Sequence, residues 1–335
     1  MIITNRRGLP RLAALSFATR AFVGSALAFV LSFATLSGAS ADEKLRVGKA
    51  VPQAFSFALL DVGVRQGLFR AEGLEIEISA FGGGARLQQA LAADAIDIGL
   101  DTGPDMAFIA KGAPVKAVAA MAGPPLDTGI AAGAKTTIHD IADLRGRRIA
   151  GPPYTLTGWL TKEFARRQGW GFDGITLIDT GSVNTSWAMV KTGEVDGLSV
   201  DLGSALQAQA RGEARLIARF GDWIKEFHNY VVFSTTKLVA ERPNDVRGFL
   251  RGWFKTIAFV RAKKGPTVEI IADVLKMDPD LVGKVYDLQL PMYSTDGHFD
   301  PKALAVLARS YVEMGNLQTE PDMKTLYTEA YLPEK

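Results

Sequence analysis

Short apolar strands alternate with helical stretches twice along this chain, and this order constrains the fold more than any other feature. From Leu45 onward, stretches with helical periodicity separate the runs LRVGK, EIEISA, IDIGL and VKAVAAM. A second set starts near Asp140 and repeats the order with a strand at 148–151 and the runs ITLID, VDGLSV and ARLIARF. Such alternation is typical of helices on both faces of a mainly parallel sheet. Its repetition predicts an α/β protein with two similar lobes.

Two extended runs and a helical tail complete the chain. TGIAAGAKTT follows the first set and HNYVVFSTT follows the second, so both are placed to carry the chain between lobes. Beyond Thr236, four helical stretches follow one another without a strand, so they must cover structure already built, most economically the first lobe. We therefore predict lobe one from residues 42–131 and 232–335, and lobe two from residues 132–231.

The first 41 residues differ in composition from the rest. They contain four arginines, no acidic residue, a 16-residue apolar run and then Ala39-Ser40-Ala41. This order predicts a signal peptide that is cleaved before Asp42, and therefore export to the periplasm. A membrane anchor is the alternative, although the run is shorter than the roughly 20 residues that span a bilayer. The secretory and twin-arginine routes both stay open, because Arg6-Arg7 has a poor twin-arginine continuation.

Composition argues against several kinds of site. Without the four arginines of residues 1–41, 34 basic residues remain against 36 acidic ones, so nothing favours nucleic-acid binding. The chain has no cysteine, which excludes disulfides and cysteine nucleophiles. Its three histidines, His139, His228 and His298, show no metal-ligand spacing. We predict neither a metal nor a cofactor, and the sequence contains no recognisable catalytic constellation.

In open α/β sheets, ligands bind at the carboxyl ends of the strands. The loops there are rich in Gly, Thr, Ser and Asn, which offer backbone N–H groups and hydroxyls to a small polar or anionic group. The glycines of FGGG either permit a tight turn or also let the backbone approach a ligand, and Arg86 either reaches an anion or is solvated. The candidate ligand-binding residues are Gln53, Phe55, Gly83, Gly84, Arg86, Asp101, Thr102, Tyr154, Thr155, Thr157, Asn184, Thr185 and Asp201.

Two stretches, DAIDIGLDTG and GEVDGLSVDLG, place aspartates in the same way. Asp97 and Asp196 stand at the heads of strands, where we expect them to hydrogen-bond locally and shape a turn. Asp101 and Asp201 stand at the carboxyl ends of the same strands. We predict that they face a ligand from the two lobes.

Four segments, GLFRAEGLEIEI, ALAADAIDIG, DLRGRRIA and GEVDGLSV, resemble the periplasmic substrate-binding proteins of nitrate, sulfonate, taurine and thiamine-precursor ABC importers. The resemblance extends over essentially the whole chain after residue 41. It implies a two-lobed periplasmic-binding-protein fold with a type II hinge, which closes on a ligand between the lobes and then docks on a membrane permease. It also implies a monomer without enzyme activity.

The chain departs from this family in two loops. Many relatives carry a Ser where this chain has Gly82-Gly83-Gly84, and a Pro near Asp201-Leu202-Gly203. These departures shift the expected hydroxyl donors to Thr102, Thr155 and Thr157. They also suggest that Asp201 meets a ligand amine, which favours a zwitterion or a heterocycle over nitrate.

The expected function is the solute-binding component of an ABC importer for a small organic molecule: a sulfonate, a taurine-like zwitterion or a heterocyclic precursor. One alternative is a periplasmic sensor that presents its closed form to a receptor. Another is a biosynthetic enzyme on the same scaffold, although the cysteine-rich motif of the pyrimidine-synthesising relatives is absent here.

Overall fold

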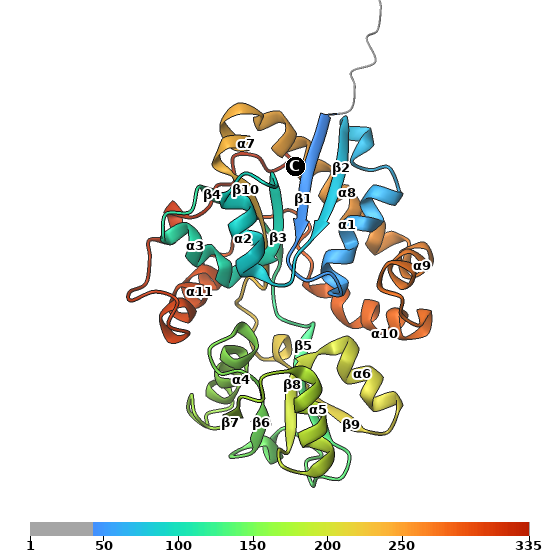
Figure 1. The fold of residues 1–335 in the computed structure, drawn as a ribbon, viewed down its shortest axis with the longest axis vertical. Coiled ribbons are helices and arrows are strands. Elements are labelled where there is room, and N and C mark those ends of the chain that lie inside the picture. The colour runs from blue at the N-terminus through green and yellow to red at the C-terminus, as the bar shows by residue number, and fades with distance from the viewer. Residues whose placement is uncertain (1–42, 335) are drawn as a thin grey trace, which may run out of the picture. The chain divides into compact units, whose positions relative to one another are not determined.

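Two five-stranded sheets organise the protein (Figure 1). The computed structural model describes residues 43–334, so the predicted signal peptide lies outside the described residues. The first sheet has the strand order β2-β1-β3-β10-β4, and the second has the order β7-β6-β8-β5-β9. We call the first sheet with its helices lobe one, and the second sheet with its helices lobe two.

The strands of lobe one are β1 (Glu43–Lys49), β2 (Leu74–Ala80), β3 (Ile98–Thr102), β4 (Val115–Ala122) and β10 (Tyr230–Thr235). Its helices are α1 (Phe55–Arg65), α2 (Gly84–Ala92), α3 (Ala107–Ala110), α7 (Thr236–Glu241), α8 (Pro243–Ala262), α9 (Lys264–Leu275), α10 (Pro279–Gln289) and α11 (Pro301–Glu313).

The strands of lobe two are β5 (Thr128–Gly133), β6 (Arg148–Ala150), β7 (Thr176–Ile178), β8 (Gly197–Asp201) and β9 (Ala214–Arg219). Its helices are α4 (Leu156–Arg167), α5 (Val183–Thr192) and α6 (Leu202–Ala210). No helix among residues 43–334 combines the length and the apolar character that crossing a membrane requires.

The chain changes sheet at 123–127 and again at 220–229, not at the predicted boundaries 131/132 and 231/232, which fall inside β5 and β10. The two runs that were expected to link the lobes therefore form strands: the first run forms β5 of lobe two, and the second forms β10 of lobe one. β5 runs antiparallel to β8 and β9, and β10 runs antiparallel to β3 and β4. In each sheet four strands therefore run in one direction and one, β10 or β5, runs in the other, so both sheets are mainly parallel, as predicted, with one antiparallel strand.

The helical tail packs on lobe one, as predicted. Helices α8 and α9 contact α1, α7 contacts β10, and the Tyr311 hydroxyl of α11 donates to the carbonyl of Gly103 at 3.2 Å. The expected break at Asp278-Pro279 is the start of α10, where the Asp278 side chain accepts from the N–H groups of Asp280 and Leu281.

Apolar residues fall into two buried clusters. The larger one fills lobe one and continues into lobe two through the side chains of α4, such as Trp159 and Phe164. The smaller one lies under α5 and α6, with Val190 and Ala205 among its members. Because side chains alternate along a strand, Ile130 of β5 joins the first cluster and Ala131 joins the second.

Both lobes contain the same pair of hydrogen bonds between an aspartate and a neighbouring strand, at the start of a central strand. In lobe one, the N–H of Arg46 donates to Asp97 Oδ2 at 2.8 Å, and the N–H of Asp97 donates to the carbonyl of Arg46 at 2.8 Å. In lobe two, Arg148 and Asp196 make the same two bonds, both at 2.8 Å. The local structural role expected for Asp97 and Asp196 is confirmed.

Candidate functional site

The carboxyl ends of the parallel strands in both lobes lie beside the two connections between the lobes. Thr102, the last residue of β3, pairs with Tyr230, where the second connection enters β10. Asp201, the last residue of β8, pairs with Thr128, where the first connection enters β5. β1 and β2 run parallel to β3, and β6 and β7 run parallel to β8, so all six strands end at these positions. We call them the crossover edges, and the predicted loops lie there.

Helices α1 and α2 begin at the crossover edge of lobe one without a side-chain cap. Their N-cap residues, Ala54 and Gly83, make no capping hydrogen bond through a side chain. Because the N–H groups of a first helical turn have no partner inside the helix, these turns present donors and a positive dipole end. Gly83 has φ 130°, which L residues rarely adopt. Gln53 is exposed just before α1, whereas the side chain of Phe55 is buried.

Arg86 is exposed on the first turn of α2, and its guanidinium folds back over the glycine turn. A Cβ on Gly82 would lie 3.2 Å from Arg86 Nη1. Among residues 43–334, no carboxylate forms an ion pair with Arg86. A guanidinium in this position, together with the uncapped turn, favours an anionic group.

Asp101 is buried at the end of β3, although sequence reasoning expected it to face a ligand. Its carboxyl accepts from Gln88 Nε2 at 3.0 Å and from the N–H of Thr102 at 2.8 Å. The Thr102 hydroxyl donates to Asp105. Burial, together with the neighbouring carboxyl of Asp105, raises the pKa of Asp101 well above its ordinary value. A Cβ on Gly84 would lie 2.5 Å from Asp105 Oδ2 and 2.8 Å from Asp101 Oδ1, so the acid pair lies directly against the glycine turn.

In lobe two, the candidate residues cap their own helices. Thr155 Oγ1 accepts from the N–H of Gly158 at 3.3 Å at the start of α4. Asp201 Oδ1 accepts from the N–H of Ser204 at 2.9 Å at the start of α6. Both side chains remain exposed, so each can still hydrogen-bond to another partner. The two lobes therefore differ, since side chains cap the helices of lobe two at this edge but not those of lobe one.

The other candidates of lobe two lie on the same edge. Tyr154 precedes α4 and is 78% exposed, and Thr157 is partly exposed on the first turn of α4. Asn184 and Thr185 are exposed on the first turn of α5, where the N–H of Thr185 donates to Ser182 Oγ at 3.1 Å. Ser182, which sequence reasoning did not select, is thus the residue that caps α5.

Sequence reasoning also missed a buried cluster that joins the two connections. The Asp127 carboxylate accepts from Asn229 Nδ2 at 2.9 Å and from Thr128 Oγ1 at 3.1 Å, and the Tyr230 hydroxyl also donates to it. Burial raises the pKa of Asp127, and these hydrogen bonds oppose that rise. A signal was present, because the tripeptide Asp-Thr-Gly at 101–103 recurs at 127–129 and 179–181.

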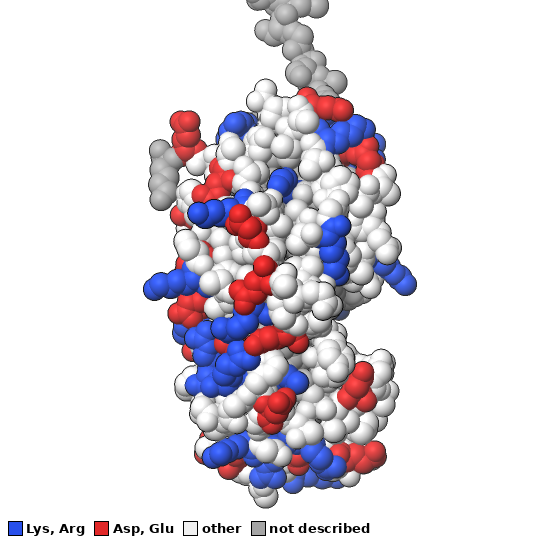
Figure 2. Space-filling model, turned by 90° about the vertical axis from the view of Figure 1, so that its left-hand side faces the viewer, with Lys and Arg blue, Asp and Glu red and all other residues white. Residues whose placement is uncertain are grey.

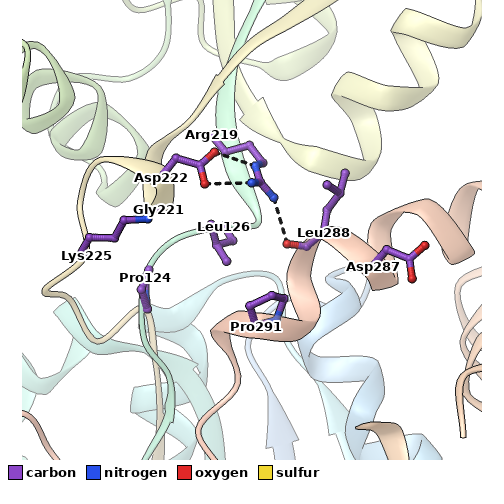
Figure 3. Close-up of a pocket in the computed structure, with 9 residues that line it drawn as sticks. All are labelled: Pro124, Leu126, Arg219, Gly221, Asp222, Lys225, Asp287, Leu288 and Pro291. Atoms are coloured by element: carbon purple, nitrogen blue, oxygen red, sulfur yellow. Dashed lines mark hydrogen bonds and ion pairs between the residues drawn. The ribbon is translucent and has the colours of Figure 1, made fainter. Parts of the chain in front are cut away.

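A pocket of about 400 Å³ lies at the connections themselves (Figure 3). Pro124 and Leu126 of the first connection line it, opposite Arg219, whose guanidinium donates to Asp222 at 2.9 Å and to the carbonyl of Leu288 at 3.1 Å. Two further pockets, of about 570 and 280 Å³, lie between α6 and α10 and around His228. None of these three pockets is lined by a predicted ligand-binding residue.

The side chains of His228 and His298 have structural partners. His228 is buried, its Nε2 accepts from the N–H of Asp300 at 3.0 Å, and burial lowers its pKa to about 4. His298 Nδ1 pairs with Glu329 at 3.0 Å. Among residues 43–334, no group of three or more His, Asp or Glu side chains is placed to hold a metal ion.

Solved structures of sulfonate-binding proteins share this arrangement of two lobes. The aliphatic sulphonate binding protein SsuA from Escherichia coli superposes with a TM-score of 0.70 at 17% identity, covering 85% of this chain and 92% of that one. The alkanesulfonate-binding protein SsuA from Xanthomonas axonopodis pv. citri, bound to MOPS, has a TM-score of 0.65 at 19% identity, covering 84% and 95%.

An enzyme shares the fold as well. The structure of DszB, a desulfurization enzyme, in complex with biphenyl-2-sulfinic acid has a TM-score of 0.65 at 17% identity, covering 87% of this chain and 97% of that one. No curated protein matches the chain in sequence. A family described as NMT1/THI5 like matches residues 54–264, which is more than half of the chain. The chain therefore belongs to the NMT1/THI5-like family and has the two-lobed periplasmic-binding-protein fold.

Proposed function

We propose that this protein is the solute-binding component of an ABC importer. It captures a small organic molecule between its crossover edges, closes on it by a hinge motion at the two connections, and delivers it to a permease in the inner membrane. It does so as a periplasmic monomer, after removal of residues 1–41. The observation that carries the proposal is the convergence of six strand ends, with uncapped helix N-termini in one lobe and exposed polar caps in the other.

The exposed apolar side chains favour a ligand with an apolar part. Val51, Tyr154 and Val183 are 42%, 78% and 56% exposed, and each lies on a loop or first helical turn at a crossover edge. Exposed apolar side chains that gather at one edge of a protein are typical of ligand contacts. Arg86 and the uncapped N-terminus of α2 supply the complementary site for an anionic head. A sulfonate or a charged heterocycle fits this combination better than nitrate does.

Asp201 gives a direct test of an amine on the ligand. Replacing it by Asn keeps a helix cap but removes the charge. We expect the affinity for a zwitterionic ligand to fall while α6 remains intact, and unchanged affinity would show that no ligand ammonium meets this carboxylate.

The experiment that tests the function is a thermal-shift screen of residues 42–335 against alkanesulfonates, taurine, nitrate, pyrimidines, flavins and aromatic carboxylates. A ligand at a hundred times its dissociation constant stabilises a protein by about 2.7 kcal/mol, which corresponds to roughly 5 °C for a chain of this size. If no compound in the panel shifts the midpoint, the ligand classes proposed here are wrong.

A second function, hydrolysis of a sulfur-containing compound, is favoured by the likeness to DszB alone. This chain has no cysteine, and His228 and His298 are engaged with Asp300 and Glu329. We therefore propose binding without turnover. Release of sulfite together with the free arene from an aromatic sulfinate, measured at high protein concentration, would favour the enzyme instead.

A further inference from the structure

The boundary between the lobes has two edges, and they are held in different ways. At one edge α4 of lobe two meets α11 of lobe one, and at the other α6 of lobe two meets α10 of lobe one. The first edge is tied by charged and aromatic contacts, whereas the second contains a groove.

Ion pairs connect α4 to α11. Glu163 of α4 is 1% exposed, and its carboxylate accepts from Arg309 of α11 at 3.0 Å and from Arg167 of its own helix at 2.9 Å. Glu313 of α11 in turn accepts from Arg166 of α4 at 2.6 Å. Separating these helices would break the Glu163–Arg309 and Glu313–Arg166 pairs, which are charged contacts between the two lobes at this edge. Figure 2 shows Lys and Arg side chains gathered beside acidic ones on this face.

The same edge carries buried aromatic contacts. Trp159 of α4 stacks on Phe227 of the second connection, with ring centroids 5.4 Å apart, and its indole N–H donates to Glu313 at 2.7 Å. Both aromatic side chains are buried and belong to the cluster that is continuous with the core of lobe one. Opening this edge would expose both rings to water and replace the hydrogen bond from the indole N–H to Glu313 by one to water.

The α6–α10 edge is tied less strongly: beside it, Arg219 of β9 donates to the carbonyl of Leu288 of α10 at 3.1 Å. Within residues 43–334, no hydrogen bond or ion pair joins α6 to α10, and a groove of about 570 Å³ runs between them. Leu206 and Ala210 line it from α6, and Leu281 and Lys284 line it from α10. Ala205 and Ala208, which α6 buries, belong to the smaller apolar cluster, and the partly buried Leu206 is the α6 side chain that packs against the larger one.

We propose that the α4–α11 contact is the fixed pivot of the molecule, and that lobe two turns about it so that the α6–α10 edge opens and closes. The inference rests on the proposed function only in that this motion would close the crossover edges on a ligand. The loop before α4, with Tyr154, then moves least, and the starts of α5 and α6, with Thr185 and Asp201, move most. The pivot is a positioning device, since none of its residues touches the ligand.

Because the chain has no cysteine, pairs of spin labels can be placed without background. One pair is Lys162→Cys with Val312→Cys, across α4 and α11. The other is Gln207→Cys with Lys284→Cys, across α6 and α10. Pulsed electron spin resonance on the ligand-free protein then gives the distribution of distances at each edge. We expect a narrow distribution across α4–α11 and a broad one across α6–α10.

Glu313→Gln tests whether the ties cause the difference. It removes the charge opposite Arg166 while keeping an acceptor for Trp159, and it should broaden the α4–α11 distribution. Glu241→Gln, an exposed change on α7, should leave both distributions as they were. Equal widths at the two edges of the unmodified chain, or no effect of Glu313→Gln, would overturn the pivot. Since no ligand is used, failure of the proposed function would leave this result intact.

Discussion

Gly84 is the most constrained position of the glycine turn, and replacing it by Ala tests the packing of the candidate site directly. The new Cβ would lie 2.5 Å from Asp105 Oδ2 and 2.8 Å from Asp101 Oδ1, and real Cβ atoms do not approach that closely. Neither carboxyl is free to withdraw, because Thr102 and Gln88 hold them. The turn or the acid pair must therefore shift.

Overpacking of this kind costs about 1–3 kcal/mol, whereas Ala gains up to about 1 kcal/mol over Gly in a helix. We expect Gly84→Ala to lower the free energy of unfolding by about 1–2 kcal/mol. Gly283→Ala is the matched control, since Gly283 lies inside α10 with nothing within 4 Å of the added Cβ. It should raise the free energy of unfolding by about 0.5–1 kcal/mol.

Urea unfolding at pH 7 measures both variants, and an unchanged m value shows that only stability has changed. In an Asp105→Ala background the nearest obstacle is gone, so Gly84→Ala should cost less there, by about 1 kcal/mol in a double-mutant cycle. The reasoning is refuted if Gly84→Ala stabilises the protein as much as Gly283→Ala does, or if Asp105→Ala leaves its cost unchanged.

Three further predictions concern stability. The pKa of His228 is about 4 in the folded protein, against an ordinary value of 6.5. Between these values the unfolded chain binds a proton that the folded chain does not. The free energy of unfolding should therefore be highest above pH 6.5 and fall by about 3 kcal/mol on acidification to pH 4. His228→Gln should reduce this pH dependence in urea unfolding series, and an equal slope in both proteins would contradict the assignment. Trp159→Phe loses the hydrogen bond to Glu313 and should cost about 1.5–3 kcal/mol, whereas Trp223→Phe, at a 41% exposed position, should change unfolding by less than about 0.5 kcal/mol. Thr155→Ala should cost about 1 kcal/mol through loss of the α4 cap, and Thr155→Ser should restore it; equal stability of the two would show that the cap is not formed.

The strands and helices could be predicted from the sequence because each is a run of one periodicity between clear breaks. The sheet that each of the two crossing runs joins could not be predicted from the sequence. TGIAAG is small and apolar on both faces, so it carries no alternation that would mark a central strand, and no local signal says which sheet it joins. In the structure each run forms a strand with a neighbour on both sides: β5 lies between β8 and β9, and β10 lies between β3 and β4. These neighbours are distant in sequence, so local sequence does not indicate the pairing.

The candidate site could be predicted as a set of loops but not as a set of side-chain roles. Asp97 and Asp196 were predictable, because the repetition between lobes exposed a shared local pattern. For Thr155 and Asp201, the sequence does not tell whether an oxygen serves its own helix or a ligand. Asp101 is buried because α2 covers the end of β3, and sequence spacing does not reveal that coverage.

The antiparallel strands at the crossings also set an order in which the chain can fold. Lobe two is one continuous stretch, and its sheet is complete once residue 219 has been made. Lobe one needs β10 between β3 and β4, so its sheet stays split until residue 235 has emerged. Contacts between segments so distant in sequence form slowly. During synthesis the later-encoded lobe can therefore fold first, while the first hundred residues wait for a strand that is made after it.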